Sequence, residues 1–120
     1  MHMTEMTLYH NPRCSKSRAA LELLQSRGLN PAVVRYLETP LSEDRLATLV
    51  DKLGVSARSL LRKGEEEYQA LGLAASEVTE EQIIKAMAMH PKLIERPILE
   101  TDTRAVVGRP PERVLELCNE

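Results

Sequence analysis

In the first third of the chain, two short apolar segments flank a longer segment in which apolar residues recur at the spacing of a helix. Residues 6–10 (MTLYH) and 32–37 (AVVRYL) are short segments with aromatic or β-branched side chains, which favour strands. Between them, the apolar side chains of residues 16–27 recur at helical spacing, and Gly28 is typical of the residue that follows a helix. The pattern predicts a strand, a helix and a second strand.

The middle of the chain is predicted to be helical. Ser42 is a suitable N-cap for an amphipathic stretch that ends at Gly54. A shorter helix is expected over residues 57–63, and Thr79 begins the T-x-x-Q capping box of a further helix. We expect these helices to form an insertion at about residues 42–90.

Strand character returns near the C-terminus. Residues 96–100 (RPILE) and 104–107 (RAVV) flank a turn and predict a β-hairpin. Residues 110–120 predict a closing helix, because proline is tolerated in the first turn of a helix. We interpret residues 1–120 as a single α/β domain in which a βαβ unit precedes a ββα unit, the order of the thioredoxin fold.

Composition and charge exclude several classes of protein. The hydrophobic content of 42% over 120 residues is enough for a packed core, and the net charge of −2 gives no general attraction to nucleic acid. No apolar run approaches the roughly 20 residues needed to span a bilayer. The first residues lack the hydrophobic segment of a secretory signal. We expect a cytoplasmic protein with neither a membrane nor a nucleic-acid partner, and we assign no function to His2.

The two cysteines, Cys14 and Cys118, lie near opposite ends of the chain. A structural disulfide is uncommon in a cytoplasmic protein. Neither cysteine has a Cys or His neighbour at the spacing of zinc ligands. We therefore expect thiol chemistry without a metal or a bound cofactor.

Cys14 lies in the segment YHNPRCSKSR, between the first predicted strand and the first predicted helix. Unpaired N–H groups and the helix dipole stabilise a thiolate at the start of a helix. Neighbouring cations lower a thiol pKa further from its ordinary value of about 8.5. Cys14 is therefore a candidate nucleophile with a lowered pKa, and the alternative is a small buried apolar residue. The candidate cations are His10, Arg13, Lys16 and Arg18.

The residues after Cys14 exclude two familiar thiol sites. A phosphatase loop needs an arginine after five intervening residues, and that position is Ala20 here. A dithiol oxidoreductase needs C-x-x-C, and the second position is Ser17. Ser17 either donates a hydrogen bond to a thiolate or a bound oxyanion, or simply belongs to the start of the helix.

Three arginines form a second candidate group. An isolated arginine is usually a solvated surface residue, whereas a cluster of planar guanidiniums suits a tetrahedral oxyanion. The spacing along the chain leaves open whether these three meet. They are Arg62 at the end of RSLLR, Arg96 before Pro97 and Arg109 before Pro110.

Four blocks of the sequence resemble the glutaredoxin-coupled arsenate reductases and their close relatives, in order and with matching spacing. They are YHNPRCSKSR, LLRKGEEEYQALGL, HPKLIERPI and GRPPERVL, and the resemblance runs from Thr7 to about Leu117. It implies a thioredoxin-like fold with a helical insertion. Ser15 and Lys16 replace the glycine and threonine of the plasmid-type enzymes, which makes the chain more similar to their chromosomal relatives.

The resemblance also implies roles for individual residues. Cys14 matches the nucleophile that attacks arsenate, and His10 matches a histidine that favours the thiolate. Pro97 matches a cis proline that faces the active site. The implied oxyanion-binding residues are Arg62, Arg96 and Arg109; we add Ser17 as a catalytic residue and Asn11 and Arg18 as supporting residues of the loop.

We therefore expect an oxidoreductase that reduces arsenate to arsenite, with glutathione as co-substrate and glutaredoxin as partner. Two alternatives stay open. One is an Spx-type regulator that binds RNA polymerase and senses disulfide stress, although that family typically carries C-x-x-C. The other is a monothiol oxidoreductase that acts on another oxyanion or on a glutathionylated substrate.

Cys118 has a different setting from Cys14. Val114, Leu117 and Cys118 recur at helical spacing in the closing segment, which is typical of a face that packs on a core. Burial among apolar side chains raises a thiol pKa. We expect Cys118 to be a packing residue without a role in the reaction.

Overall fold

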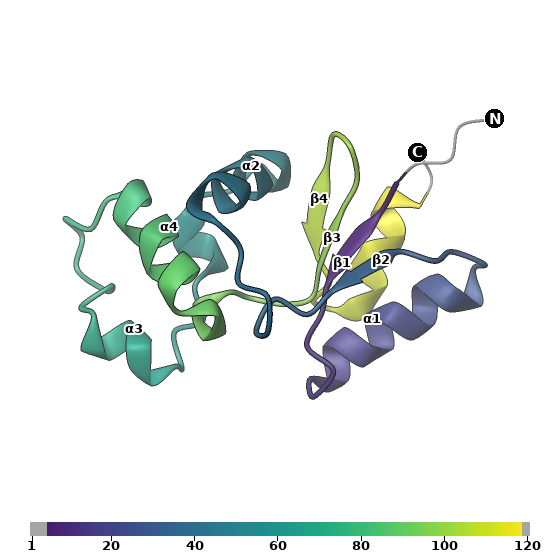
Figure 1. The fold of residues 1–120 in the computed structure, drawn as a ribbon, viewed down its shortest axis with the longest axis horizontal. Coiled ribbons are helices and arrows are strands. Elements are labelled where there is room, and N and C mark those ends of the chain that lie inside the picture. Colours follow the sequence, from purple (N-terminus) through teal and green to yellow (C-terminus); the bar gives the residue numbers. More distant parts are fainter. Residues whose placement is uncertain (1–4, 119–120) are drawn as a thin grey trace. The chain divides into compact units, whose positions relative to one another are not determined.

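The computed structural model describes residues 5–118, so His2 lies outside the described part of the chain. The chain divides into two compact units (Figure 1). We call residues 5–39 and 96–118 the sheet unit, and Pro40–Glu95 the helical unit. The single-domain interpretation, with its insertion at about residues 42–90, stays a prediction.

Within the described residues, the sheet unit holds a four-stranded sheet in the order β2-β1-β3-β4 (Figure 1). Strand β1 (Thr7–Tyr9) pairs in parallel with β2 (Ala32–Val34) and antiparallel with β3 (Ile98–Glu100). Strand β3 pairs antiparallel with β4 (Ala105–Val107), which is the predicted hairpin. The predicted α/β class is confirmed.

Helix α1 (Ser15–Ser26) connects the parallel strands β1 and β2. Gly28 follows the end of the helix as predicted, and its φ of 75° is easily adopted only by a residue without Cβ. The N–H groups of Gly28 and Leu29 donate to carbonyls in the last turn of α1, which satisfies groups that the helix leaves open. The second strand is shorter than the predicted 32–37, because the chain turns where the Arg35 carbonyl accepts hydrogen bonds from two later N–H groups.

The core of the sheet unit lies between one face of the sheet and two helical segments, α1 and the 3-10 helix η3 (Pro111–Leu117). Leu8 of β1 pairs with Leu99 of β3, and Leu99 pairs with Val106 of β4, so that three apolar side chains lie side by side on this face. Their burial removes apolar surface from water and is the main favourable term in forming the unit. The buried core residues are Leu8, Ala20, Leu24, Leu99, Val106, Val114 and Leu117.

The closing helix differs in type from the prediction. Its hydrogen bonds join residues three apart, as in the bond from the Arg113 N–H to the Pro110 carbonyl, so η3 is a 3-10 helix. Residues three apart share one face of such a helix, and this lets both Val114 and Leu117 enter the core. The predicted segment extends to residue 120, and its last two residues lie outside the described chain.

The helical unit contains the predicted helices, with their predicted caps. The Ser42 hydroxyl accepts a hydrogen bond from the Arg45 N–H at the start of α2, and Gly54 ends that helix with a φ of 69°. Thr79 and Gln82 form the predicted capping box of the fourth α-helix. The elements are α2 (Glu43–Leu53), the 3-10 helix η1 (Ala57–Leu60), α3 (Glu66–Ala70), α4 (Glu80–Met89) and the 3-10 helix η2 (Pro91–Leu93).

Two details of the helical unit depart from the prediction. The helix expected over residues 57–63 ends at Leu60, because Leu61 is extended and forms a β-bridge with Ile94. Helix α3 was not predicted: it is one short element without a buried residue, so it has no apolar stripe. Among residues 5–118, no helix combines the length and apolar character needed to cross a membrane.

Gly108 offers a test of packing between the hairpin and η3. Its N–H donates to the Pro97 carbonyl at 2.8 Å, and an added Cβ would lie 2.9 Å from both Pro97 Cγ and Val114 Cγ1. Neither a proline ring nor a core valine can easily move away. Gly108→Ala should therefore lower the free energy of unfolding by about 1–3 kcal/mol, as measured by urea denaturation.

The matched control is Gly64→Ala, because a Cβ at Gly64 would meet no atom within 4 Å. This variant should unfold at a urea concentration close to that of the wild type. Equal stability of the two variants would contradict the packing described at Gly108.

Candidate active site

The strand register brings several loops to one edge of the sheet. Tyr9 pairs with Ile98, and Ile98 pairs with Val107. The residues that follow β1, precede β3 and follow β4 therefore lie at the same edge. Strand β2 is parallel to β1, so the residue that follows β2 lies there too. We call this the loop edge, and it carries His10, Arg35, Pro97 and Gly108.

Cys14 is the N-cap residue of α1, as the sequence predicts. Its backbone is extended, with φ −94° and ψ 123°, and its carbonyl accepts a hydrogen bond from the Arg18 N–H at 3.0 Å. The half-buried side chain makes no capping hydrogen bond. The thiol therefore lies at the positive end of the helix dipole, where an anion is stabilised.

The loop before Cys14 is shaped by Asn11 and Arg18. Asn11 Oδ1 accepts a hydrogen bond from the Arg13 N–H at 3.0 Å, and the Asn11 carbonyl accepts one from the Cys14 N–H at 3.0 Å. Arg18 Nη1 donates to the Pro12 carbonyl at 2.9 Å. Both side chains thus hold the loop from within, and their supporting role in the reaction stays a prediction.

Ser17 joins this loop to the first turn of α1. Its side chain is fully buried, and its Oγ accepts a hydrogen bond from the Asn11 N–H at 3.0 Å. The same Oγ lies 2.6 Å from His10 Nδ1. A serine hydroxyl has a single proton, so a Ser17 that donates to His10 is not at the same time donating to Cys14.

His10 is buried at the loop edge with only 5% of its surface exposed. Burial lowers its pKa below the ordinary value of 6.5, and the positive charges of Arg35 and Arg18 lower that pKa further. The neutral imidazole therefore predominates at pH 7. A neutral ring with its proton on Nε2 accepts the Ser17 hydrogen bond at Nδ1. His10 was one of the candidate cations near Cys14, and the structure instead favours an uncharged hydrogen-bonding role.

Arg96 and Arg109 lie together at the two ends of the β3–β4 hairpin. Arg109 Nη1 donates to the Arg96 carbonyl at 2.9 Å, and both side chains are partly buried. The peptide bonds that join them to Pro97 and Pro110 are cis, which for Pro97 agrees with the resemblance. Pro97 lies at the loop edge, and the structure thus brings two of the three predicted arginines together.

Arg62, the third predicted arginine, belongs to the helical unit. Its guanidinium lies 3.5 Å from a Glu65 carboxylate oxygen and 3.6 Å from one of Glu95, and its side chain is 27% exposed. Two carboxylates therefore offset its charge. That Arg62 joins Arg96 and Arg109 around one oxyanion stays a prediction.

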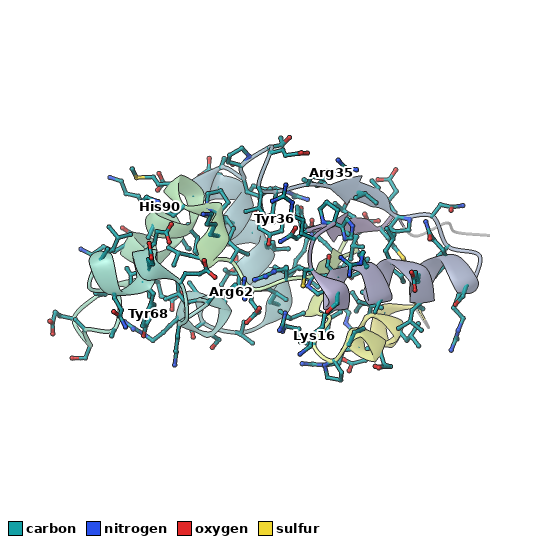
Figure 2. All side chains as sticks on the ribbon, turned by 90° about the horizontal axis from the view of Figure 1, so that it is seen from below. Lys16, Arg35, Tyr36, Arg62, Tyr68 and His90 are labelled. Carbon is teal, nitrogen blue, oxygen red and sulfur yellow. The ribbon has the colours of Figure 1, made fainter. Side chains whose placement is uncertain are left out.

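Arg35 is a residue of the loop edge that the sequence reasoning missed. It was placed inside the predicted strand 32–37, whereas the strand ends at Val34 and leaves Arg35 at the edge beside His10. The available signal was the change from the apolar run Ala32–Val34 to a charged residue. Within the sheet unit, Figure 2 shows Arg35 after β2 and Lys16 at the first turn of α1.

The pattern of the ArsC family matches residues 9–117, which include every predicted site residue. This protein belongs to the ArsC family. Its sequence is 51% identical over 114 residues to uncharacterized protein YfgD of Escherichia coli K12, covering 94% of this chain and 96% of the relative. It is 46% identical over 115 residues to an arsenate reductase of Escherichia coli, covering 96% of this chain and 82% of the relative.

A solved structure extends the comparison to the fold. The arsenate reductase of Vibrio cholerae superposes with a TM-score of 0.92 at 46% identity, covering 96% of this chain and 98% of that one. The predicted family and the predicted thioredoxin-like fold are thereby confirmed. The residues that carry out the reaction in this ArsC protein stay predictions.

Cys118 of this ArsC protein lies where the sequence predicts. It packs against the core of the sheet unit, and its Sγ lies 3.5 Å from the Val114 carbonyl oxygen. Burial raises the pKa of the Cys118 thiol, and the positive charge of Arg27 opposes that rise. Its environment is thus that of a packed thiol rather than an activated one.

The lowered pKa of His10 predicts how stability depends on pH. The unfolded chain takes up a proton at His10 near pH 6.5, whereas the folded protein resists that proton. His10 therefore contributes to the stability of the folded protein above about pH 6.5, and this contribution is lost as the pH falls. The free energy of unfolding should change with pH by at most about 1.4 kcal/mol per pH unit because of His10. Urea denaturation between pH 5 and pH 8 measures this slope.

His10→Gln removes the titrating ring and should flatten that part of the profile, whatever its effect on stability at pH 8. Direct titration of the His10 ring by NMR should give a midpoint below 6.5. Identical pH slopes in the wild type and the variant would contradict the assignment.

Proposed function

We propose that this ArsC-family protein reduces arsenate to arsenite, with Cys14 as the nucleophile, glutathione as the electron donor and glutaredoxin as the enzyme that regenerates Cys14. The observation that carries the proposal is the position of Cys14 as N-cap of α1, in the same unit as the paired Arg96 and Arg109. The sequence similarity to arsenate reductases supports the substrate.

In the first step the Cys14 thiolate attacks arsenic. A sulfur–arsenic bond forms and one arsenic–oxygen bond breaks, and the oxygen leaves as water after taking up protons. Negative charge is concentrated on the oxyanion and on the sulfur. The open N–H groups of the first turn of α1 and the guanidiniums of Arg96 and Arg109 are suited to stabilise this charge.

In the second step the sulfur of glutathione attacks the Cys14 sulfur. A disulfide forms, the sulfur–arsenic bond breaks and its electron pair stays on arsenic, which is reduced from As(V) to As(III) and released as arsenite. A thiol of glutaredoxin then attacks the glutathione sulfur and frees Cys14 by thiol–disulfide exchange. Two thiols supply the two electrons in each turnover.

His10 and Ser17 assist by position in this proposal. Their hydrogen bond, together with the bond from the Asn11 N–H to Ser17 Oγ, holds the loop that presents Cys14. The neutral state of His10 at pH 7 means that its help to the thiolate comes from orientation and hydrogen bonding. The positive charge comes from the arginines and from the helix N-terminus.

The two cysteines provide a matched pair of variants for the reaction. NADPH consumption is followed with arsenate, glutathione, glutaredoxin and glutathione reductase. Cys14→Ser should abolish turnover, because a hydroxyl is a far weaker nucleophile than a thiolate. Cys118→Ser should keep glutathione-dependent turnover, with a modest loss of stability from a hydroxyl in an apolar site.

Mass spectrometry of the stalled reaction should find glutathione on Cys14. A Cys14–Cys118 disulfide as the main product, together with loss of turnover in Cys118→Ser, would overturn this mechanism. If the wild type turns over no arsenate, assays with other oxyanions and glutathionylated proteins, and a pull-down of RNA polymerase, address the two alternatives.

The paired arginines generate a further prediction. Lysine keeps the charge of arginine but loses the planar fork that binds two oxygens of one oxyanion. Arg96→Lys and Arg109→Lys should each lower kcat/KM for arsenate by at least roughly tenfold. Circular dichroism should show both variants folded.

Arg113→Lys is the matched control, because Arg113 is an exposed residue that pairs with Glu116 on η3. It should keep wild-type kcat/KM. Near-normal turnover in both Arg96→Lys and Arg109→Lys would show that these residues do not bind the oxyanion.

A further inference from the structure

A hollow of about 630 Å³ opens in the sheet unit beside His10. Its volume lies within the range of about 300–1,000 Å³ that is usual for small-molecule sites. It is bordered by α1, by β2 and by the turn that follows β2, and neither Arg96 nor Arg109 lines it. The lining residues include His10, Leu21, Val34, Arg35, Glu38 and Thr39.

Leu21 is the residue of α1 that lines the hollow, and it lies on the same side of the helix as Cys14. Cys14, Ser17 and Leu21 are spaced by three and then four residues, so they lie on one side of the helix. Leu21 is about 10 Å from Cys14 along the helix axis. An extended tripeptide spans about 10 Å, so a peptide that contacts Leu21 can extend to the neighbourhood of Cys14.

The strand register connects the hollow to the loop edge. Tyr9 pairs with Val34, and the His10 N–H donates to the Val34 carbonyl at 2.9 Å, so Arg35 follows beside His10. The His10 ring in turn contacts Ser17 in the first turn of α1. One wall of the hollow is therefore held rigidly to the loop that carries Cys14.

The charges of the hollow are complementary to a zwitterionic peptide. Arg35 and Glu38 form an ion pair of 3.8 Å, and their side chains are 58% and 68% exposed. Such an exposed pair contributes little to stability and opens easily. Arg35 can then bind a carboxylate through two parallel hydrogen bonds, and Glu38 can accept from an ammonium group.

We propose that this hollow binds the thiol co-substrate, a short peptide with two carboxylates and an ammonium group, and that Arg35 binds one of its carboxylates. This inference rests on the proposed function, which identifies the peptide as glutathione. The oxyanion and the co-substrate then use different residues: Arg96 and Arg109 bind arsenate, whereas Arg35 and Glu38 bind glutathione.

Arg35→Gln tests the site through the choice of thiol. Release of arsenite is measured directly at pH 8, with an excess of glutathione or of 2-mercaptoethanol, which has no carboxylate, as the only thiol. His10 is neutral at this pH with or without Arg35, so the substitution acts through binding. The preference for glutathione, as the ratio of the two kcat/KM values, should fall roughly fivefold to tenfold.

Arg113→Gln is the matched control. Arg113 is also an exposed arginine in an i,i+3 pair with a glutamate, but it lies on η3 and does not line the hollow. It should keep the wild-type preference. An unchanged preference in Arg35→Gln, or an equal loss in Arg113→Gln, would overturn the proposed site.

A second measurement does not depend on arsenate turnover. Titration with S-methylglutathione, which cannot react, should shift the amide NMR signals of Leu21, Val33 and Thr39, and Arg35→Gln should weaken this binding roughly fivefold to tenfold. Shifts confined to other residues, or equal affinity in the variant, would contradict the site.

The two measurements separate the inference from the function on which it rests. If the wild type reduces no arsenate but S-methylglutathione binds in the hollow, the proposed reaction is wrong and the thiol site stands. If arsenate is reduced and Arg35→Gln keeps its preference for glutathione, the reaction stands and the site is wrong.

Discussion

The antiparallel register of β1 and β3 determines where the candidate site of the sheet unit can form. Leu8 and Leu99 are paired and fully buried, so a slip of either strand by one residue would turn the buried leucine of that strand out of the core. Their burial therefore specifies the register strongly. The same register places His10, which leads into the Cys14 loop, at the edge where Pro97 precedes β3. Packing on one face of the sheet thus determines which residues lie at the loop edge.

The start of α1 differs from the starts of α2, η1 and α4. Hydroxyls of Ser42, Ser56 and Thr79 cap α2, η1 and α4, and each such cap is worth about 1 kcal/mol. Helix α1 has Cys14 at this position and no side-chain cap. Its first N–H groups stay available for a bound anion. A serine at position 14 would stabilise the helix start as a cap. The protein has a cysteine there instead, at the position where the proposed reaction needs a thiol and a bound oxyanion.

Polar contacts hold the loop that precedes this open helix start. Ser17 Oγ joins the Asn11 backbone and the His10 ring, and Arg18 holds the Pro12 carbonyl. The two bonds of the fully buried Ser17 satisfy groups that would otherwise cost free energy on burial, whereas the Arg18 bond is exposed. Together they order the loop without using the Cys14 side chain. The two thiols differ accordingly: Cys14 lies at the open N-terminus of α1, whereas Cys118 packs on the core with a raised pKa.

The sequence by itself determined the order of helices and strands, the caps at Ser42 and Thr79, the place of Cys14 at a helix start and the packing role of Cys118. These features depend on local hydrogen bonding and on the spacing of apolar side chains, and both are set by residues that are close together in the sequence. Only the tertiary structure decided that β2 stops at Val34, that η3 is a 3-10 helix and that Arg109 contacts Arg96. It also decided the burial that lowers the pKa of His10 and the place of Arg35 beside it. Those properties depend on burial and on contacts between residues far apart in the chain, and local pattern does not encode them.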